Sequence, residues 1–184
     1  MTNQQLKTEI IQRQKAEEEV RQLSLTDELT KLYNRRGFIW LGEREREKAH
    51  RHEQYCVLFF IDLDGLKKVN DNYGHEMGDQ MIIETANILK QTFRVIDVIA
   101  RLGGDEFAVL AIVDDYSTIE ILEQRLQNNL QKFNQSSCHV YQLLMSIGKV
   151  ADNNWQKPQP LNTLMMQADE QMYHQKKQKK QCRS

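Results

Sequence analysis

The chain has 184 residues, enough for one well-packed domain with a short appendage and too few for two ordinary domains. Its 25 basic and 26 acidic residues nearly cancel, so the sequence lacks the positive charge typical of DNA- and RNA-binding proteins. The odd number of cysteines and their lack of metal-ligand spacing predict free thiols in a reducing compartment, the cytoplasm; they are Cys56, Cys138 and Cys182. The sequence has neither a signal-peptide core nor a run of about 18 apolar residues, so it predicts a soluble chain without a membrane segment.

Residues 1–23 are rich in Gln, Glu, Lys and Arg and contain no Gly or Pro, which favours a helix. Leu6, Ile10 and Val20 fall on one side of that helix, but Arg13 and Glu17 interrupt the apolar seam. A weak coiled coil and a solvated helix fit this pattern equally well.

The rest of the chain alternates between strand and helix signals. Tyr55–Leu63 is a short apolar run rich in aromatic and β-branched residues, which is typical of a buried strand. The other expected elements are a helix at 78–94, strands at 97–102 and 105–113, a helix at 117–133, a strand at 140–150 and a helix from Leu161. The order βαββαβ with a terminal helix predicts an α+β fold, with helices packed around a mostly antiparallel central sheet.

The two middle strands flank only Gly103 and Gly104, which predicts a tight hairpin, because glycine adopts positive φ without steric penalty. Large aromatic residues on apolar faces are expected in the core rather than as stacking platforms for a ligand; they are Phe38, Trp40, Phe59, Phe60 and Phe107.

Four acids mark the ends of two of these strands. Asp62 and Asp64 end the first strand, and Asp105 and Glu106 begin the strand after the hairpin. If the two strands are neighbours, their carboxylates converge into an oxygen-rich site suited to Mg²⁺ and substrate phosphates. Acids also mark strand ends because those places are wet, and the spacing alone favours neither interpretation.

The segment between the acids is GLKKVNDNYGHEMGD. Backbone amides near Gly65 and the charge of Lys67 suit a phosphate, and Asn70 and Asp79 suit the edge of a guanine base. Taken alone, the segment fits a helix cap and loop better than a binding site.

Five segments together resemble the GGDEF family of diguanylate cyclases, in order and at the family's spacing, across about residues 24–181: LTDELTKLYNRRGF, IDLDGLKKVNDNYGHEMGD, RVIDVIARLGGDEF, MSIG and ADEQMY. The resemblance implies a palm-like fold and an enzyme that condenses two GTP into cyclic di-GMP and two pyrophosphates. It makes residues 24–184 the cyclase domain and residues 1–23 the end of a signalling helix. It also implies an upstream sensory or receiver domain if the chain is a fragment, and a cytoplasmic location for either form.

The resemblance assigns metal ligands to the acids. Asp62, the backbone carbonyl of Leu63 and Asp105 would bind Mg²⁺, or Mn²⁺ in its place, with Glu106 close to the second of two ions in each half-site. Asp105 is also the usual acceptor of the proton from the attacking 3′ hydroxyl. A bound ion lowers the basicity of a carboxylate, so activation of the hydroxyl by the metal is expected to contribute more.

Substrate contacts follow from the same motifs. Lys67 would stabilise charge on the phosphates, Asn70 and Asp79 would recognise guanine, and His75 belongs to the substrate-contact loop. In the last helix Lys176 aligns with a lysine that contacts phosphate. The family's usual Gly-Arg-Asn is Lys179, Lys180 and Gln181 here, so Lys180 replaces an arginine fork with a point charge.

The pair Arg94 and Asp97 matches the family's inhibitory product-binding site, where an arginine forks onto guanine. Because each subunit holds one GTP, the resemblance also implies a homodimer in which each 3′ hydroxyl attacks the partner's α-phosphate. The main alternative is a catalytically silent GGDEF domain that acts as a receptor for GTP or cyclic di-GMP. A structural dimerisation module is a third interpretation, but it leaves the intact acids unexplained.

Overall fold

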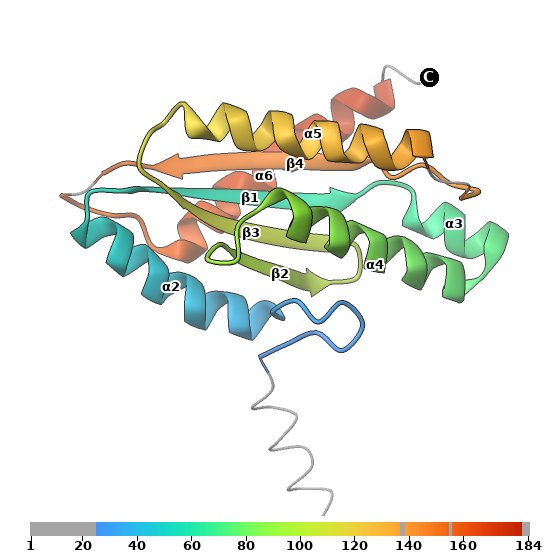
Figure 1. Ribbon diagram of the computed structural model, residues 1–184, viewed down its shortest axis with the longest axis horizontal. Helices are drawn as coiled ribbons and strands as arrows, with labels where there is room; N and C mark the ends of the chain where they lie inside the picture. Colours follow the sequence, from blue (N-terminus) through green and yellow to red (C-terminus); the bar gives the residue numbers. More distant parts are fainter. Residues whose placement is uncertain (1–24, 137–138, 155, 182–184) are drawn as a thin grey trace, which may run out of the picture.

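The structure is a computed structural model that describes residues 25–136, 139–154 and 156–181, with the side chain of Lys180 outside the description. The helix expected at residues 1–23 lies outside these ranges, as do Cys138 and Cys182. Within them, four strands form one antiparallel sheet in the order β2-β3-β1-β4 (Figure 1). The strands are β1 (Tyr55–Leu63), β2 (Val98–Gly103), β3 (Glu106–Val113) and β4 (Met145–Asp152). The helices are α2 (Arg35–Arg51), α3 (Leu66–Tyr73), α4 (His75–Thr92), α5 (Thr118–Ser136) and α6 (Leu161–Gln181).

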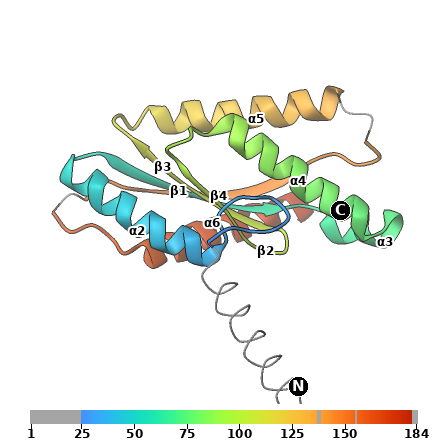
Figure 2. The same ribbon diagram turned by 60° about the horizontal axis from the view of Figure 1, so that its bottom comes forward.

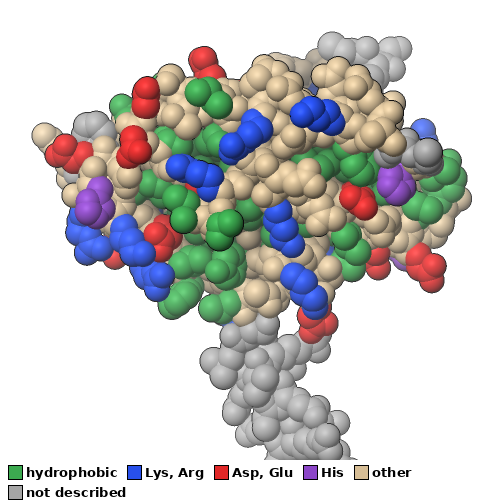
Figure 3. Space-filling view, in the orientation of Figure 1, with side chains coloured by type: hydrophobic (Ala, Val, Ile, Leu, Met, Phe, Trp, Pro, Cys, Tyr) green, Lys and Arg blue, Asp and Glu red, His purple; other side chains and the backbone are tan. Residues whose placement is uncertain are grey.

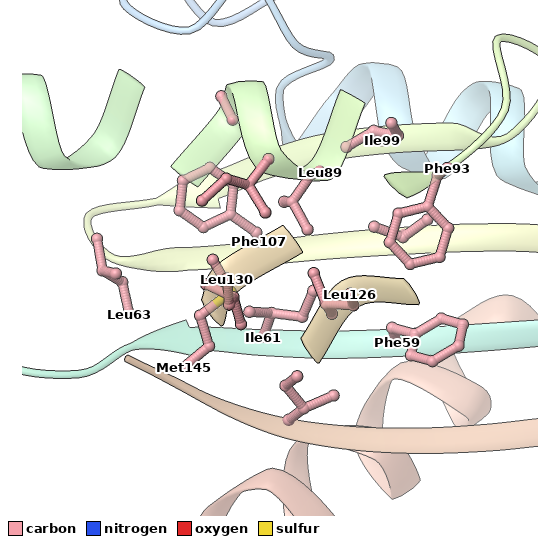
Figure 4. Close-up of a cluster of buried hydrophobic side chains, with 14 of the residues drawn as sticks. Phe59, Ile61, Leu63, Leu89, Phe93, Ile99, Phe107, Leu126, Leu130 and Met145 are labelled. Carbon is pink, nitrogen blue, oxygen red and sulfur yellow. The ribbon is translucent and has the colours of Figure 1, made fainter. Parts of the chain in front are cut away.

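Helices cover both faces of the sheet (Figure 2). Because successive residues of a strand point to opposite faces, β1 contributes to two separate cores. Phe59 and Ile61 pack under α4 and α5 in the larger core, shown in Figure 4, and Leu58 and Phe60 pack against α2 and α6 in the smaller one. The predicted α+β fold with a mostly antiparallel sheet is confirmed.

The surface agrees with the near-neutral charge of the sequence. Figure 3 shows Lys and Arg side chains in separate groups on one face, with acidic and hydrophobic side chains between them. No helix in the described ranges is long and apolar enough to cross a bilayer.

Two helices were not expected. The polar segment after β1 was interpreted as a cap and loop, yet it forms α3, which ends where Gly74 adopts a φ of 87°. The next helix, α4, therefore begins at His75 rather than at residue 78. Helix α2 begins where the side chain of Asn34 accepts a hydrogen bond from the Gly37 amide at 2.9 Å. The sequence analysis missed α2 because its many charged residues obscure the helical repeat of the apolar face that carries Phe38.

The hairpin turn and the start of β4 also differ from the predictions. Gly103 pairs with Glu106, so the residues at the hairpin turn are Gly104, with φ of 50°, and Asp105, rather than two glycines. Strand β4 begins at Met145 rather than at residue 140, because the side chain of Asn134 bonds both backbone groups of Leu143 in place of a strand partner.

The prediction that five aromatic residues lie in the core is confirmed for four of them and wrong for Trp40. The Trp40 side chain is 57 % exposed on α2. The guanidinium of Arg44 lies over its ring, with Cζ of Arg44 5.5 Å from the ring centroid.

Candidate active site

The acids expected to meet at the sheet are neighbours in it. Asp62 on β1 lies opposite Glu106 on β3 in the antiparallel register. One residue further, the Leu63 amide donates a hydrogen bond to the carbonyl of Asp105 at 2.9 Å. The end of β1 and the hairpin turn are therefore joined by backbone hydrogen bonds, which hold the four positions at one edge of the sheet.

The core on the opposite face of the sheet holds these strand ends in place. Ile61, Leu63 and Phe107 are fully buried under α4 and α5 (Figure 4). Asp62 and Glu106 alternate with them and so point to the face that α2 and α6 cover.

Helix α6 approaches this face closely because Gly148 on β4 has no side chain. A Cβ atom at Gly148 would lie 1.8 Å from the carbonyl oxygen of Ala168 on α6. This explains the glycine of the MSIG segment. The close packing brings Lys176 to Asp62, with 2.5 Å between its Nζ and Oδ1 of the carboxylate.

The ion pair is partly buried and lies among other acids. Burial raises the pKa of Asp62, as do the charges of Asp105 and Asp64, and together they outweigh the hydrogen bond from Lys176. Burial alone would lower the pKa of Lys176, but the hydrogen bond to Asp62 and the surrounding acids raise it. The ammonium of Lys176 therefore stays charged and neutralises part of the acidic cluster.

Glu106 faces two residues to which the sequence analysis gave no role. Burial raises the pKa of Glu106, the charges of Asp169 and Asp105 raise it further, and the charge of Arg35 opposes them. Asp169 belongs to the ADEQMY segment and Arg35 to the NRRGF segment, so their place in the motifs was the available signal.

The cluster suits a hard cation. The charge of Asp105 raises the pKa of both Asp62 and Glu106, so negative charge is concentrated here, and carboxylate and carbonyl oxygens are the ligands that Mg²⁺ prefers. Among the described residues, no three acidic, His or Cys side chains already form a metal-binding group. Lys176 supplies the positive charge on Asp62 in this arrangement.

A cavity of about 280 Å³ opens beside the acids. It is lined by Leu63, Asp64, Gly65, Leu66, Lys67, Asp105, Lys176 and Lys179. The cavity thus unites the predicted phosphate contacts Lys67 and Lys176 with Asp105. The sequence analysis chose Lys180 as the second lysine of α6, and its side chain lies outside the described residues. Among the described side chains of α6, Lys179 lines the cavity together with Lys176.

The predicted guanine contacts lie on the helix pair α3–α4. Asn70 packs on Gly78, where a Cβ atom would lie only 1.8 Å from the Asn70 Oδ1. That Oδ1 is buried and accepts no hydrogen bond from any described residue. Asp79 and His75 are exposed in the first turns of α4. These three residues do not line the phosphate cavity, so the structure places them near one another but does not join them to it.

The predicted product site lies on the other side of the sheet. The Arg94 amide donates to Asp97 Oδ2 at 2.7 Å, and the Arg94 guanidinium donates to the Ile112 carbonyl at 2.6 Å. Burial raises the pKa of Asp97, opposed by the amide and charge of Arg94 and by the charge of Arg125 on α5. The pair borders a cavity of about 450 Å³, lined by Thr26, Lys31, Leu32, Tyr33, Lys90, Phe93, Arg94, Val95, Asp97 and Ile99.

These features define a palm-like α+β domain with an acidic site beside one cavity and the Arg94–Asp97 pair beside another. The chain matches the family model described as "Diguanylate cyclase, GGDEF domain" over residues 24–182, and it belongs to this family. It is 38% identical over 164 residues to the bifunctional diguanylate cyclase/cyclic di-GMP phosphodiesterase MucR of Pseudomonas aeruginosa, covering 89% of this chain and 24% of MucR. The chain thus spans about a quarter of that relative.

Two solved structures are similar. The GGDEF domain of TpbB (YfiN) from Pseudomonas aeruginosa has a TM-score of 0.74 and 30% identity, covering 83% of this chain and 89% of that one. A microbial GGDEF domain, solved to describe its interaction with bis-(3′,5′)-cyclic di-GMP, has a TM-score of 0.68 and 29% identity, covering 83% and 92%. Both comparisons agree with the fold and the family.

Proposed function

We propose that this chain is a diguanylate cyclase that condenses two GTP into cyclic di-GMP and two pyrophosphates. The observation that carries the proposal is the edge where Asp62 pairs with Glu106 and the Leu63 amide bonds the Asp105 carbonyl, beside a cavity lined by three lysines. Carboxylates on one side and ammonium groups on the other suit a nucleoside triphosphate with its metal ions.

In the proposed reaction, the 3′ hydroxyl oxygen of one GTP forms a bond to the α-phosphorus of the other. The bond from that phosphorus to the bridging oxygen of the β-phosphate breaks, and pyrophosphate leaves. Lys67, Lys176 and Asp105 line one cavity. We assign to the two lysines the neutralisation of charge on the phosphates, and to Asp105 the acceptance of the hydroxyl proton. Asp62, the Leu63 carbonyl, Asp105 and Glu106 would hold Mg²⁺, which supplies Lewis-acid stabilisation of the developing charge.

The proposed reaction needs two chains. One edge of acids with one phosphate cavity accommodates one triphosphate, whereas ring closure requires two GTP that attack each other. We therefore propose a homodimer with one GTP in each subunit, so the specific activity should rise with protein concentration.

We also propose that the Arg94–Asp97 cavity binds cyclic di-GMP and inhibits the enzyme. The Arg94 guanidinium is half-exposed, donates through Nη2 to the Ile112 carbonyl and has its Nε 3.8 Å from Asp97 Oδ2, so its exposed side suits a guanine edge. The likeness to a GGDEF domain described with cyclic di-GMP supports the choice of ligand.

The test is incubation of the full chain with GTP and Mg²⁺, followed by chromatographic detection of cyclic di-GMP and a separate assay for pyrophosphate. Asp105→Asn should lower product formation by at least about a hundredfold, because it removes a charge that acts on the reacting groups. Asp114→Asn is the matched control, since Asp114 is an exposed acid just after the opposite end of β3.

Equal product from wild type and Asp105→Asn would overturn the site. Bound nucleotide without product in either protein would instead favour the catalytically silent receptor.

A further inference from the structure

Lys179 is a residue of α6 to which the family motifs give no role. Its Nζ donates to the carbonyl of Met145 and lies 3.5 Å from the Ser146 hydroxyl and 3.6 Å from Oδ2 of Asp64. The side chain is about a third exposed and lines the same cavity as Lys67 and Lys176. Its ammonium therefore reaches the cavity wall beside the acidic edge.

A row of side chains fixes the position of this ammonium. Residues 171, 175 and 179 are four apart and so lie along one side of α6. The side chains of Gln171 and Gln175 accept hydrogen bonds from the Lys149 and Ile147 amides of β4, at 3.4 and 2.7 Å. Lys179 continues this row to the carbonyl of Met145.

Within the described residues, β4 pairs with only one strand, β1, so its other side is an open edge of the sheet. The row of side chains forms hydrogen bonds with backbone amides and a carbonyl on that open edge. It also sets the register of α6 along β4. The Lys179 ammonium is therefore held at the cavity rather than left free in solvent.

The contacts of Lys179 also leave its charge available. Lys176 forms a close ion pair with Asp62 at 2.5 Å, whereas the nearest carboxylate oxygen to Lys179 is 3.6 Å away. Its shorter contacts are to a carbonyl and a hydroxyl, which carry no net charge. An ammonium whose shortest contact is a carbonyl and whose carboxylate partner lies 3.6 Å away can bind phosphate as a point charge at the cavity wall.

We propose that Lys179 is a triphosphate-binding residue of this enzyme, which acts on the β- and γ-phosphates of GTP alongside Lys176. The inference rests on the proposed function, because it assigns the charge to a GTP site. It adds Lys179 to the phosphate contacts that the family motifs imply, and it predicts that the side chain acts on substrate rather than only joining α6 to β4.

The test measures binding by calorimetry in the presence of Mg²⁺, using a non-hydrolysable GTP analogue and GMP as the two probes. Lys179→Gln should weaken binding of the triphosphate analogue about tenfold, or ~1.4 kcal/mol. The same substitution should change binding of GMP less than about twofold, because GMP lacks the β- and γ-phosphates. Lys179→Arg should keep triphosphate binding within about threefold, since it retains the charge.

Lys177→Gln is the matched control, because the Lys177 ammonium lies over the Tyr173 ring, 4.5 Å from its centroid, rather than at the cavity. Equal weakening of both probes by Lys179→Gln would show a structural role and overturn the inference. Triphosphate binding equal to that of the control would also overturn it. If wild type binds the analogue and Lys179→Gln binds it equally well, only this inference fails; if wild type binds neither probe, the proposed function fails with it.

Discussion

The two faces of the central sheet differ most at one end. Under α4 and α5, apolar side chains continue to the ends of the strands, where Leu63 and Phe107 are fully buried. On the face under α2 and α6, Phe60 is followed by Asp62, and Ala108 is preceded by Glu106. The same backbone thus carries a core on one face and the acidic edge on the other. The core can hold the acids in place without contacting them.

The largest expected effect tests this division with two adjacent residues of β3. Phe107→Ala should lower the free energy of unfolding by ~3–5 kcal/mol, because it removes a fully buried ring from the larger core. Glu106→Gln should change it by less than ~0.5 kcal/mol, because burial and neighbouring acids already disfavour the charge of Glu106, as its raised pKa indicates. Denaturant unfolding measures both values.

Product formation from GTP should show the reverse order for the correctly folded proteins, with the greater loss in Glu106→Gln. Similar destabilisation by the two substitutions would mean that the acidic residues contribute to the stability of the fold as much as the core does. That result would contradict the division between the two faces.

The second prediction concerns how closely α6 can approach the acidic face. Gly148→Ala should lower the free energy of unfolding by ~1–3 kcal/mol, because the new Cβ would meet backbone of α6 that cannot move alone. Gly42→Ala is the matched control, since its Cβ would come closest to a side-chain end, 2.8 Å from Cδ2 of Leu161, rather than to backbone. Thermal unfolding of both variants measures the difference in stability. Equal stability of the two variants would show that the close approach of α6 to the sheet does not depend on Gly148.

The fold could be predicted from sequence where apolar residues repeat at the period of a strand or helix. The run from Tyr55 to Leu63 and the hairpin around Gly104 carry such signals, and the family motifs located the acids. Helix α3 could not be found this way, because it buries only Val69 and its polar residues resemble a loop. Its cap is a glycine with φ of 87° and gives no side-chain hydrogen bond to recognise.

The candidate site was predictable residue by residue but not as an arrangement. The family motifs gave Lys179 no role, because the row of hydrogen bonds from Gln171 to Lys179 depends on the register of α6 against β4. Close packing at Gly148 lets α6 come near enough to β4 for this row to form, and a pattern along the chain does not contain that contact. The contributions of Arg35 and Asp169 near Glu106 likewise come from segments far apart in sequence.

The smallest expected effect separates the two cavities. The Arg94–Asp97 cavity includes Phe93 and Ile99 of the core under α4 and α5, whereas the phosphate cavity opens beside the acids of the other face. Arg94→Ala should therefore weaken binding of cyclic di-GMP at least about tenfold, or ~1.4 kcal/mol, because it removes the side chain that would fork onto guanine. Calorimetry with cyclic di-GMP measures this loss.

The initial rate of synthesis before product accumulates should stay within about twofold of wild type, because Arg94 has no proposed role in the chemistry. Arg44→Ala, which removes an exposed arginine over Trp40, is the control for loss of surface charge. If Arg94→Ala kept full affinity for cyclic di-GMP, the product site would be elsewhere. If it slowed the initial rate as strongly as it weakened product binding, the two faces would be coupled through the sheet, and the core between them would be part of the regulatory path rather than a passive support.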